Sequence, residues 1–251
     1  MKYRVYKDFE EAIAFGHSCA LAQNMGCIIF NYDYNENVSF SLLDFLFPRR
    51  SLSGEEGEWI TKEELRKLQA APVIVEGTGL QSFHGSSLDL IVAAARYDSS
   101  PLLKKAIRTF KYARIPDLHE QLGNMIASAA PIVDSREPPV LCPVPLHWSR
   151  RFQRGFNQSE LLAKVVAEKR GWILMSLLRR TRPTGHQAWR GREERRMAMK
   201  DAFSFRGSHI PAHVILIDDL CTSGSTLGEC AKVLKQAGVQ RVEGWVVALG
   251  S

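Results

Sequence analysis

Apolar runs rich in β-branched residues alternate with segments of helical spacing in the second half of the chain. His213–Ile217 and Val242–Leu249 flank the helix-type segment Thr226–Ala237, and Val140–Val144 precedes the similar segment Gln158–Glu168. Strands that alternate with helices need crossover connections, so this order predicts an α/β fold with a mostly parallel sheet covered on both faces. In such folds ligands bind at the carboxyl ends of the strands, and we expect the functional loops to cluster there.

The segments before this region are less informative. Ser100–Lys111 begins with a proline and carries an apolar stripe, and Asp117–Ala129 has the spacing of a second helix. Thr61–Gln69 opens with Thr and Glu three residues apart, which is typical of a capping box at the start of a short helix. Residues 1–40 contain no recognisable motif.

Composition limits where the protein works. The 251 residues are 45% hydrophobic, which is enough for a core, and the five cysteines are odd in number and include no CxxC pair. No apolar run reaches the roughly 18 to 20 residues that span a bilayer, and the acidic start does not resemble a secretory signal. We expect a cytoplasmic protein without membrane insertion.

Positive charge is concentrated in one segment. Ser149–Arg206 holds fifteen Lys or Arg against five Asp or Glu, whereas the whole chain has a net charge of +6. A solvated surface is one interpretation of such a segment, and an anionic partner such as phosphate or nucleic acid is the other.

The segment His213–Val239 carries the strongest functional signal. A predicted buried strand leads into Asp218 and Asp219, and a short turn follows before the helix. The backbone N–H groups and hydroxyls of this turn can surround a phosphate at the positive helix end, and its glycine allows close approach. The turn residues are Thr222, Ser223, Gly224, Ser225 and Thr226.

The two carboxylates cannot bind the phosphate, because like charges repel. They are suited to accept hydrogen bonds from a neutral diol such as the ribose 2- and 3-hydroxyls, so the pattern indicates a sugar 5-phosphate. A plain helix cap is the other interpretation, but a cap needs one hydroxyl residue and this turn has four.

The sequence DDLCTSGSTL, from Asp218, resembles the phosphoribosyl pyrophosphate (PRPP) motif of type I phosphoribosyltransferases. Pro143–Ala167, with its PVPL and RGFNQ, is similar to the signature of the ComF (competence protein F) family. Further matching points lie at Phe110–Tyr112, Thr181–Gln187 and Arg195–Phe203, and the similarity extends over Leu42–Gly250. The resemblance implies a type I phosphoribosyltransferase fold, with Asp218 and Asp219 as its catalytic positions.

The resemblance also implies a ligand-binding role for the basic segment. It implies that His147–Asn157 holds the pyrophosphate of PRPP through Arg150, Arg151, Arg154 and Gly155, since guanidinium groups suit bidentate phosphate contacts. Arg179–Phe203, too polar to be a buried element, resembles the flexible loop that closes over PRPP and excludes water. The candidates for ligand contact in that loop are Gln187, Arg192, Arg195 and Arg196.

The chain departs from the family where many members carry an N-terminal zinc ribbon built on CxxC pairs. The segment Leu42–Arg50 is present, but the positions of the pairs hold other residues: Ser51 and Gly54, Thr61 and Glu64, and Glu76 and Gly79. We expect a metal-free remnant held by apolar contacts, with no zinc. The predicted divisions are an extension at 1–40, the remnant at 41–92 and the phosphoribosyltransferase-like domain at 93–251.

Two functions remain open. One is an enzyme that binds PRPP, with Mg²⁺ held mainly by ligand oxygens and water, and transfers the phosphoribosyl group to an acceptor that the sequence does not identify. The other is an accessory factor in competence and recombination that handles single-stranded DNA beside a helicase or recombination protein and uses the PRPP site for sensing or not at all. Trp148 and Trp189, among the arginines, could stack bases in that case.

Overall fold

The computed structural model describes most of the chain after its first fifty residues. The described residues are 51–56, 59–68, 71–83, 87–112, 118–133, 137–147, 155–182, 197, 199–207 and 209–250. No helix in these ranges is both long and apolar enough to cross a membrane.

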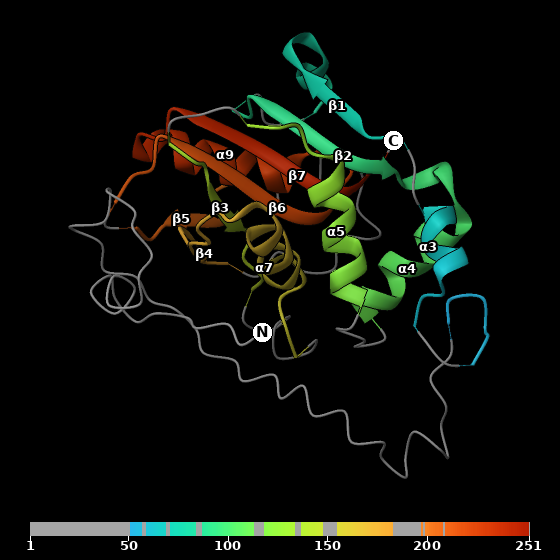
Figure 1. The fold of residues 1–251 in the computed structure, drawn as a ribbon. Coiled ribbons are helices and arrows are strands. Elements are labelled where there is room, and N and C mark those ends of the chain that lie inside the picture. Colours follow the sequence, from blue (N-terminus) through green and yellow to red (C-terminus); the bar gives the residue numbers. More distant parts are fainter. Residues whose placement is uncertain are drawn as a thin grey trace, which may run out of the picture.

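A five-stranded sheet forms the centre of the fold (Figure 1). Its strands, in spatial order, are β1 (Val73–Glu76), β2 (Leu90–Arg96), β7 (Arg241–Leu249), β6 (His213–Cys221) and β3 (Val140–Pro143). The pairs β2/β7, β7/β6 and β6/β3 are parallel, and only the edge strand β1 is antiparallel to its neighbour. The predicted α/β class with a mostly parallel sheet is confirmed.

Helices cover both faces of the sheet. Figure 1 shows α5 (His119–Ala129) and α7 (Gln158–Arg170) on one side and α9 (Ser225–Ala237) behind the sheet. One core cluster joins α5, α7 and α4 (Pro101–Tyr112) to Ile215 and Trp245 of the strands. The other joins α9 to Leu216 and Val246. These layers follow from the strands, which are apolar on both sides and therefore need cover on both.

A small hairpin lies on the α9 side of the sheet. Its strands are β4 (Leu178–Arg180) and β5 (Phe203–Phe205), which pair antiparallel. They are the two ends of the predicted flexible loop, and Ala202 and Phe203 are buried. The expectation that this whole segment is too polar to be buried was therefore wrong at its C-terminal end, because Met199, Ala202 and Phe203 join the core; Arg179, at the other end, is exposed.

The sheet is larger than the sequence indicated. β2 was not predicted, and the expected domain boundary between residues 92 and 93 falls inside it. The first strand of the sheet, β1, begins at Val73, which lies well before that boundary. β6 also continues beyond the predicted strand His213–Ile217 to Cys221, because the ladder to β7 runs on as far as the Cys221–Leu249 pair.

The described part of residues 41–92, the predicted remnant, packs on the main core. Helix α3 (Lys62–Leu68) contacts α4, and Leu52, Ile60 and Leu68 belong to the same cluster as α4, α5 and α7. The expected apolar contacts are confirmed: Trp59 and Leu65 pack against this cluster, and Val73 and Val75 pack on the opposite face of the sheet.

The predicted capping box is present at the start of α3. The Glu64 N–H donates to Thr61 Oγ1 at 3.2 Å, and the Thr61 N–H donates to Glu64 Oε2 at 2.8 Å. Glu64 is buried, and its carboxylate also accepts the Ser53 hydroxyl. Burial raises the pKa of Glu64, but the hydrogen bonds that Ser53 and Thr61 donate to the carboxylate outweigh it and lower the pKa. In the part of the chain that the structure describes, no three His, Cys, Asp or Glu side chains gather as a metal site.

Candidate functional site

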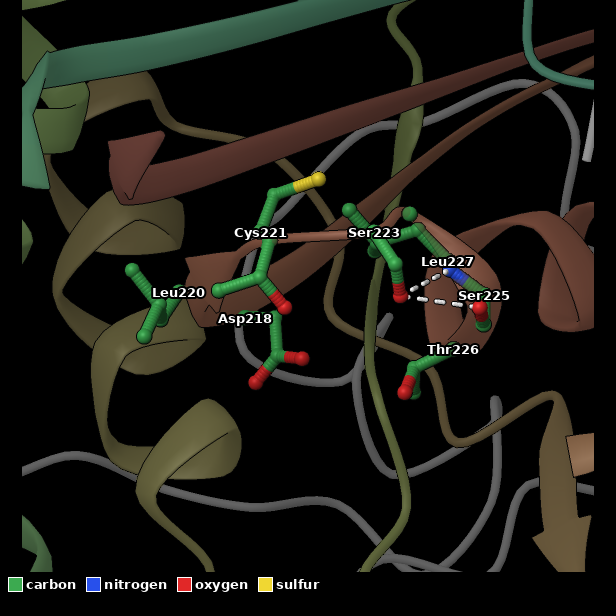
Figure 2. Close-up of a pocket in the computed structure, with 9 residues that line it drawn as sticks. Asp218, Leu220, Cys221, Ser223, Ser225, Thr226 and Leu227 are labelled. Atoms are coloured by element: carbon green, nitrogen blue, oxygen red, sulfur yellow. Dashed lines mark hydrogen bonds between the residues drawn. The ribbon is translucent and has the colours of Figure 1, made fainter. Parts of the chain in front are cut away.

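The end of β6 and the start of α9 enclose a pocket (Figure 2). Asp218 contributes its side chain from the strand, and the turn that follows forms the other walls. The lining residues are Asp218, Leu220, Cys221, Thr222, Ser223, Gly224, Ser225, Thr226 and Leu227. The structure therefore brings together Asp218 and all five residues that the sequence assigned to a sugar 5-phosphate.

Gly224 shapes the turn. It precedes the first helical residue with φ +73° and ψ −3°, a left-handed conformation that favours glycine, and its carbonyl accepts the Gly228 N–H at 2.7 Å. The first N–H groups of the thirteen-residue helix α9 have no acceptor within the helix, as at every helix start. They supply a positive end to the pocket.

The hydroxyls of the turn are not equivalent. Ser223 and Ser225 are buried, and their Oγ atoms lie 2.9 Å apart, so that one hydroxyl donates to the other; Ser223 Oγ also accepts the Ser225 N–H at 3.5 Å (Figure 2). Thr222 and Thr226 are partly exposed, and Thr226 Oγ1 lies 3.4 Å from the sulfur of Met199. The two threonines are therefore better placed than the serines to meet a ligand.

Cys221 is the last residue of β6, directly before this turn, and is buried. Burial is the main cause that raises the pKa of its thiol to about 12, and the charge of Asp218 adds to the effect. A helix N-terminus can lower the pKa of a nearby cysteine, but here desolvation outweighs that effect. Cys221 is a small packing residue.

The two carboxylates of the acidic pair have different partners. Asp218 Oδ1 accepts the Ser159 hydroxyl at 2.9 Å and the Asp219 N–H at 2.9 Å. Asp219 Oδ1 forms an ion pair with Lys111 Nζ at 2.8 Å, and the Asp219 side chain is 7% exposed. Lys111, at the end of α4, and Ser159, in the first turn of α7, thus converge on the end of β6.

Burial and the neighbouring charge of Asp219 raise the pKa of Asp218 to about 6. Lys111 and the hydrogen bonds to Oδ1 act in the opposite direction. Asp218 therefore keeps its proton to a higher pH than an ordinary aspartate.

The segment Gly155–Ser159 connects three parts of the fold around this pair. Gly155 has φ +85°, and Phe156 packs on Phe110 of α4 with ring centroids 5.8 Å apart. The Asn157 amide donates to the carbonyl of Val144 after β3 at 3.2 Å. Gln158 donates to the Lys111 carbonyl at 3.5 Å. These residues hold the start of α7 against β3, α4 and β6.

Sequence reasoning did not assign Lys111 or Ser159 to the site. Lys111 lies within the FKY match at Phe110–Tyr112, and Ser159 directly follows the RGFNQ match, so both signals were visible but carried no role. Several predicted contacts fall outside the described residues: Arg150, Arg151, Arg154, Gln187, Arg192, Arg195 and Arg196, together with Trp148 and Trp189. Residues 1–50 do so as well.

Three curated relatives resemble this chain. "Competence protein F" of Haemophilus influenzae is 35% identical over 118 residues, which are 44% of this chain and 50% of that protein. "DNA utilization protein YhgH" of Salmonella typhimurium is 30% identical over 155 residues, 59% of this chain and 67% of that protein. "Competence protein ComFC" of Bacillus subtilis is 26% identical over 226 residues, 84% and 89% of the two chains. The chain thus spans half the length of the Haemophilus relative.

Other comparisons are weaker. No family model matches the chain. A solved glutamine PRPP amidotransferase from B. subtilis, complexed with ADP and GMP, aligns with a TM-score of 0.38 and 21% identity. That alignment covers 55% of this chain and 30% of the amidotransferase.

The mostly parallel sheet, with an acidic strand end that leads through a hydroxyl-rich turn into a helix, defines an α/β protein with a candidate ligand site at the carboxyl end of a strand. Within that class, the chain belongs to the ComF family of competence and DNA utilization proteins.

Proposed function

We propose that this protein binds PRPP or a related sugar 5-phosphate in the pocket between β6 and α9. The observation that carries the proposal is the presence, in one pocket, of an acceptor carboxylate on Asp218 and the N-terminus of a thirteen-residue helix. A phosphate at the helix end and a diol at the carboxylate would satisfy both. The protein would work in the cytoplasm.

The two ends of the ligand would be held by different forces. The positive N-terminal end of α9, with Thr222 and Thr226, would bind the 5-phosphate. Asp218 would accept a ribose hydroxyl and would disfavour a second phosphate near the diol. Arg150, Arg151, Arg154 and Gly155 are proposed for the pyrophosphate, and Gln187, Arg192, Arg195 and Arg196 for a closing loop.

Magnesium would act with the ligand. Among the described residues, Asp218 and Asp219 are the carboxylates at the pocket's end of β6, and Asp219 is already paired with Lys111. This arrangement fits Mg²⁺ that is held by PRPP oxygens and water. With the ion bound, pyrophosphate would be a better leaving group, and phosphoribosyl transfer to an unidentified acceptor would be a glycosyltransferase reaction.

Calorimetric titration with PRPP and Mg²⁺ tests the proposal. We expect saturable binding by the unaltered protein and a loss of about tenfold or more in affinity for Asp218→Asn, which keeps the shape but removes the charge. Asp98→Asn is the matched control. The Asp98 side chain is 56% exposed, and its ion pair with Lys104 lies away from the pocket. No saturable binding by the unaltered protein up to about millimolar PRPP would overturn the proposal.

The names of the relatives favour a second candidate function, which is the handling of single-stranded DNA during competence or DNA utilization. The basic segment Ser149–Arg206 would follow the phosphate backbone beside a competence helicase or recombination protein. The PRPP site would then sense a metabolite or have no role.

Fluorescence anisotropy of a labelled single-stranded oligonucleotide tests this second function. We expect an affinity that falls steeply with salt and is weakened when Arg150, Arg151 and Arg154 are replaced by Ala. Arg108→Ala, on the exposed side of α4, controls for the loss of positive charge elsewhere. Binding that the triple variant leaves unchanged would exclude the basic segment as the contact surface.

A further inference from the structure

We propose that Lys111 is a positioning residue that gives the two carboxylates of the acidic pair separate tasks: Asp219 is committed to Lys111, and Asp218 alone meets the ligand. The inference rests on the proposed function for the identity of the ligand. The ion pair and its effect on Asp218 exist without any ligand.

Asp219 is already occupied. Its Oδ1 lies 2.8 Å from Lys111 Nζ, and both side chains are largely buried, at 7% and 19% exposure. Breaking such a pair leaves a charge without a partner in a place that water reaches poorly, so a ligand hydroxyl is a poor substitute for the ammonium group. Asp219 is also absent from the residues that line the pocket.

Asp218 is held in place but keeps one oxygen for a ligand. Oδ1 accepts two hydrogen bonds, from the Ser159 hydroxyl and from the Asp219 N–H. These two bonds restrict rotation of the carboxylate, and within the described ranges no hydrogen bond goes to Oδ2. Because Asp218 lines the pocket, Oδ2 is the acceptor that remains for a hydroxyl of the ligand.

Lys111 also controls the charge of Asp218. Two adjacent carboxylates oppose each other's ionisation, and the Asp219 charge raises the pKa of Asp218. The ammonium group of Lys111 lowers that pKa. Without Lys111, Asp218 would hold its proton to a higher pH, and a protonated carboxyl is a weaker acceptor for a hydroxyl.

The position of Lys111 is itself fixed by the fold. Its carbonyl accepts the side-chain amide of Gln158, next to Ser159 in α7. Phe110, its neighbour in α4, packs on Phe156. The short segment Phe156–Ser159, which leads into α7, therefore holds the lysine that pairs with Asp219 and also supplies the hydroxyl that binds Asp218.

The test compares Lys111→Met with Lys111→Arg and with the control Lys105→Met, which removes an exposed lysine from the same helix. The first readout needs no ligand: the titration of the Asp218 carboxyl is followed by carbon NMR from about pH 4 to about pH 9. We expect its midpoint to move upward in Lys111→Met and to stay near that of the unaltered protein in the other two. Folding of each variant is checked by circular dichroism.

The second readout is PRPP affinity as a function of pH. We expect Asp218→Asn to lose about tenfold or more, Asp219→Asn to lose clearly less, and Lys111→Met to need a higher pH for the same affinity. Equal losses in the two aspartate variants, or an Asp218 midpoint that does not move in Lys111→Met, would overturn the inference. Absence of PRPP binding in the unaltered protein would overturn only the proposed function, since the NMR titration still decides the role of Lys111.

Discussion

Phe83 packs against Gly224 so closely that a Cβ atom added to Gly224 would lie 2.9 Å from the Cβ of Phe83. Gly224 is also the residue with φ +73° that leads into α9. The turn Thr222–Thr226 therefore needs glycine for two independent reasons: its backbone conformation and the space beside it.

Gly224→Ala is expected to lower the free energy of unfolding by about 2 to 4 kcal/mol, from left-handed strain and from displacement of Phe83. It is also expected to weaken PRPP binding, because the N–H groups of the turn would move. Urea denaturation and calorimetry measure the two effects. Gly171→Ala is the matched control, since Gly171 has φ +66° but no atom within 4 Å of an added Cβ. Equal losses of stability in the two variants would contradict a role for Phe83.

Helices α5 and α7 approach closely at Gly123. A Cβ at this position would lie 2.6 Å from the Cβ of Val165. Gly123→Ala is expected to cost about 1 to 3 kcal/mol of unfolding free energy by pushing the helices apart, although alanine is the better helix former. Adding Val165→Ala to this variant should recover part of the lost unfolding free energy. If Gly123→Ala alone raised the unfolding free energy, the close packing of the two helices would not matter for stability.

Asp218 is expected to destabilise the ligand-free protein at neutral pH. Its folded pKa is about 6 and its ordinary value is 3.8, so stability falls as the pH rises from 3.8 through about 6. Asp218→Asn should therefore raise the unfolding free energy at pH values above about 7 by about 1 to 3 kcal/mol, with a smaller gain below about pH 4. Urea denaturation across this range measures it. Asp219→Asn should have the opposite sign at neutral pH, because Lys111 loses its partner.

Glu243 stabilises the start of β7, at the end of the strand away from the pocket. Its burial raises the pKa, but His213, whose Nε2 lies 3.0 Å from Oε1, and the hydrogen bonds from Arg241 and Trp245 lower it below the ordinary value of 4.5. A depressed folded pKa gives stability that is present above 4.5 and is lost as the pH falls through the folded value. Glu243→Gln is expected to cost about 2 to 4 kcal/mol at neutral pH.

The measurement for Glu243 is urea denaturation from about pH 3 to about pH 7. The loss caused by Glu243→Gln should shrink toward the acid end, because the native carboxylate is protonated there. Glu120→Gln, on the exposed side of α5, is the control for removal of one acid. A loss that stays constant over the whole range would contradict a stabilising carboxylate.

Local patterns were sufficient for much of the fold. The three parallel strands of the second half and the helices between them were predictable, because apolar β-branched runs and helical spacing are signals that the chain carries residue by residue. β2 was missed although its residues are apolar, since its place in the sheet depends on pairing with β7, about 150 residues later. Long-range pairing leaves no local signal.

The candidate site also combines residues that are adjacent in the sequence with residues that only the fold brings together. Asp218 and the turn Thr222–Thr226 are contiguous in sequence, so the order of the residues alone indicates their chemistry. The partners of the acidic pair come from α4 and α7, and Lys111 is 108 positions away from Asp219 in sequence. The sequence by itself therefore determined the α/β class and the hydroxyl-rich turn before α9, since both depend on neighbours in the chain. Only the tertiary structure decided that Asp219 pairs with Lys111 while Asp218 lines the pocket, because that depends on how the helices pack around the end of β6.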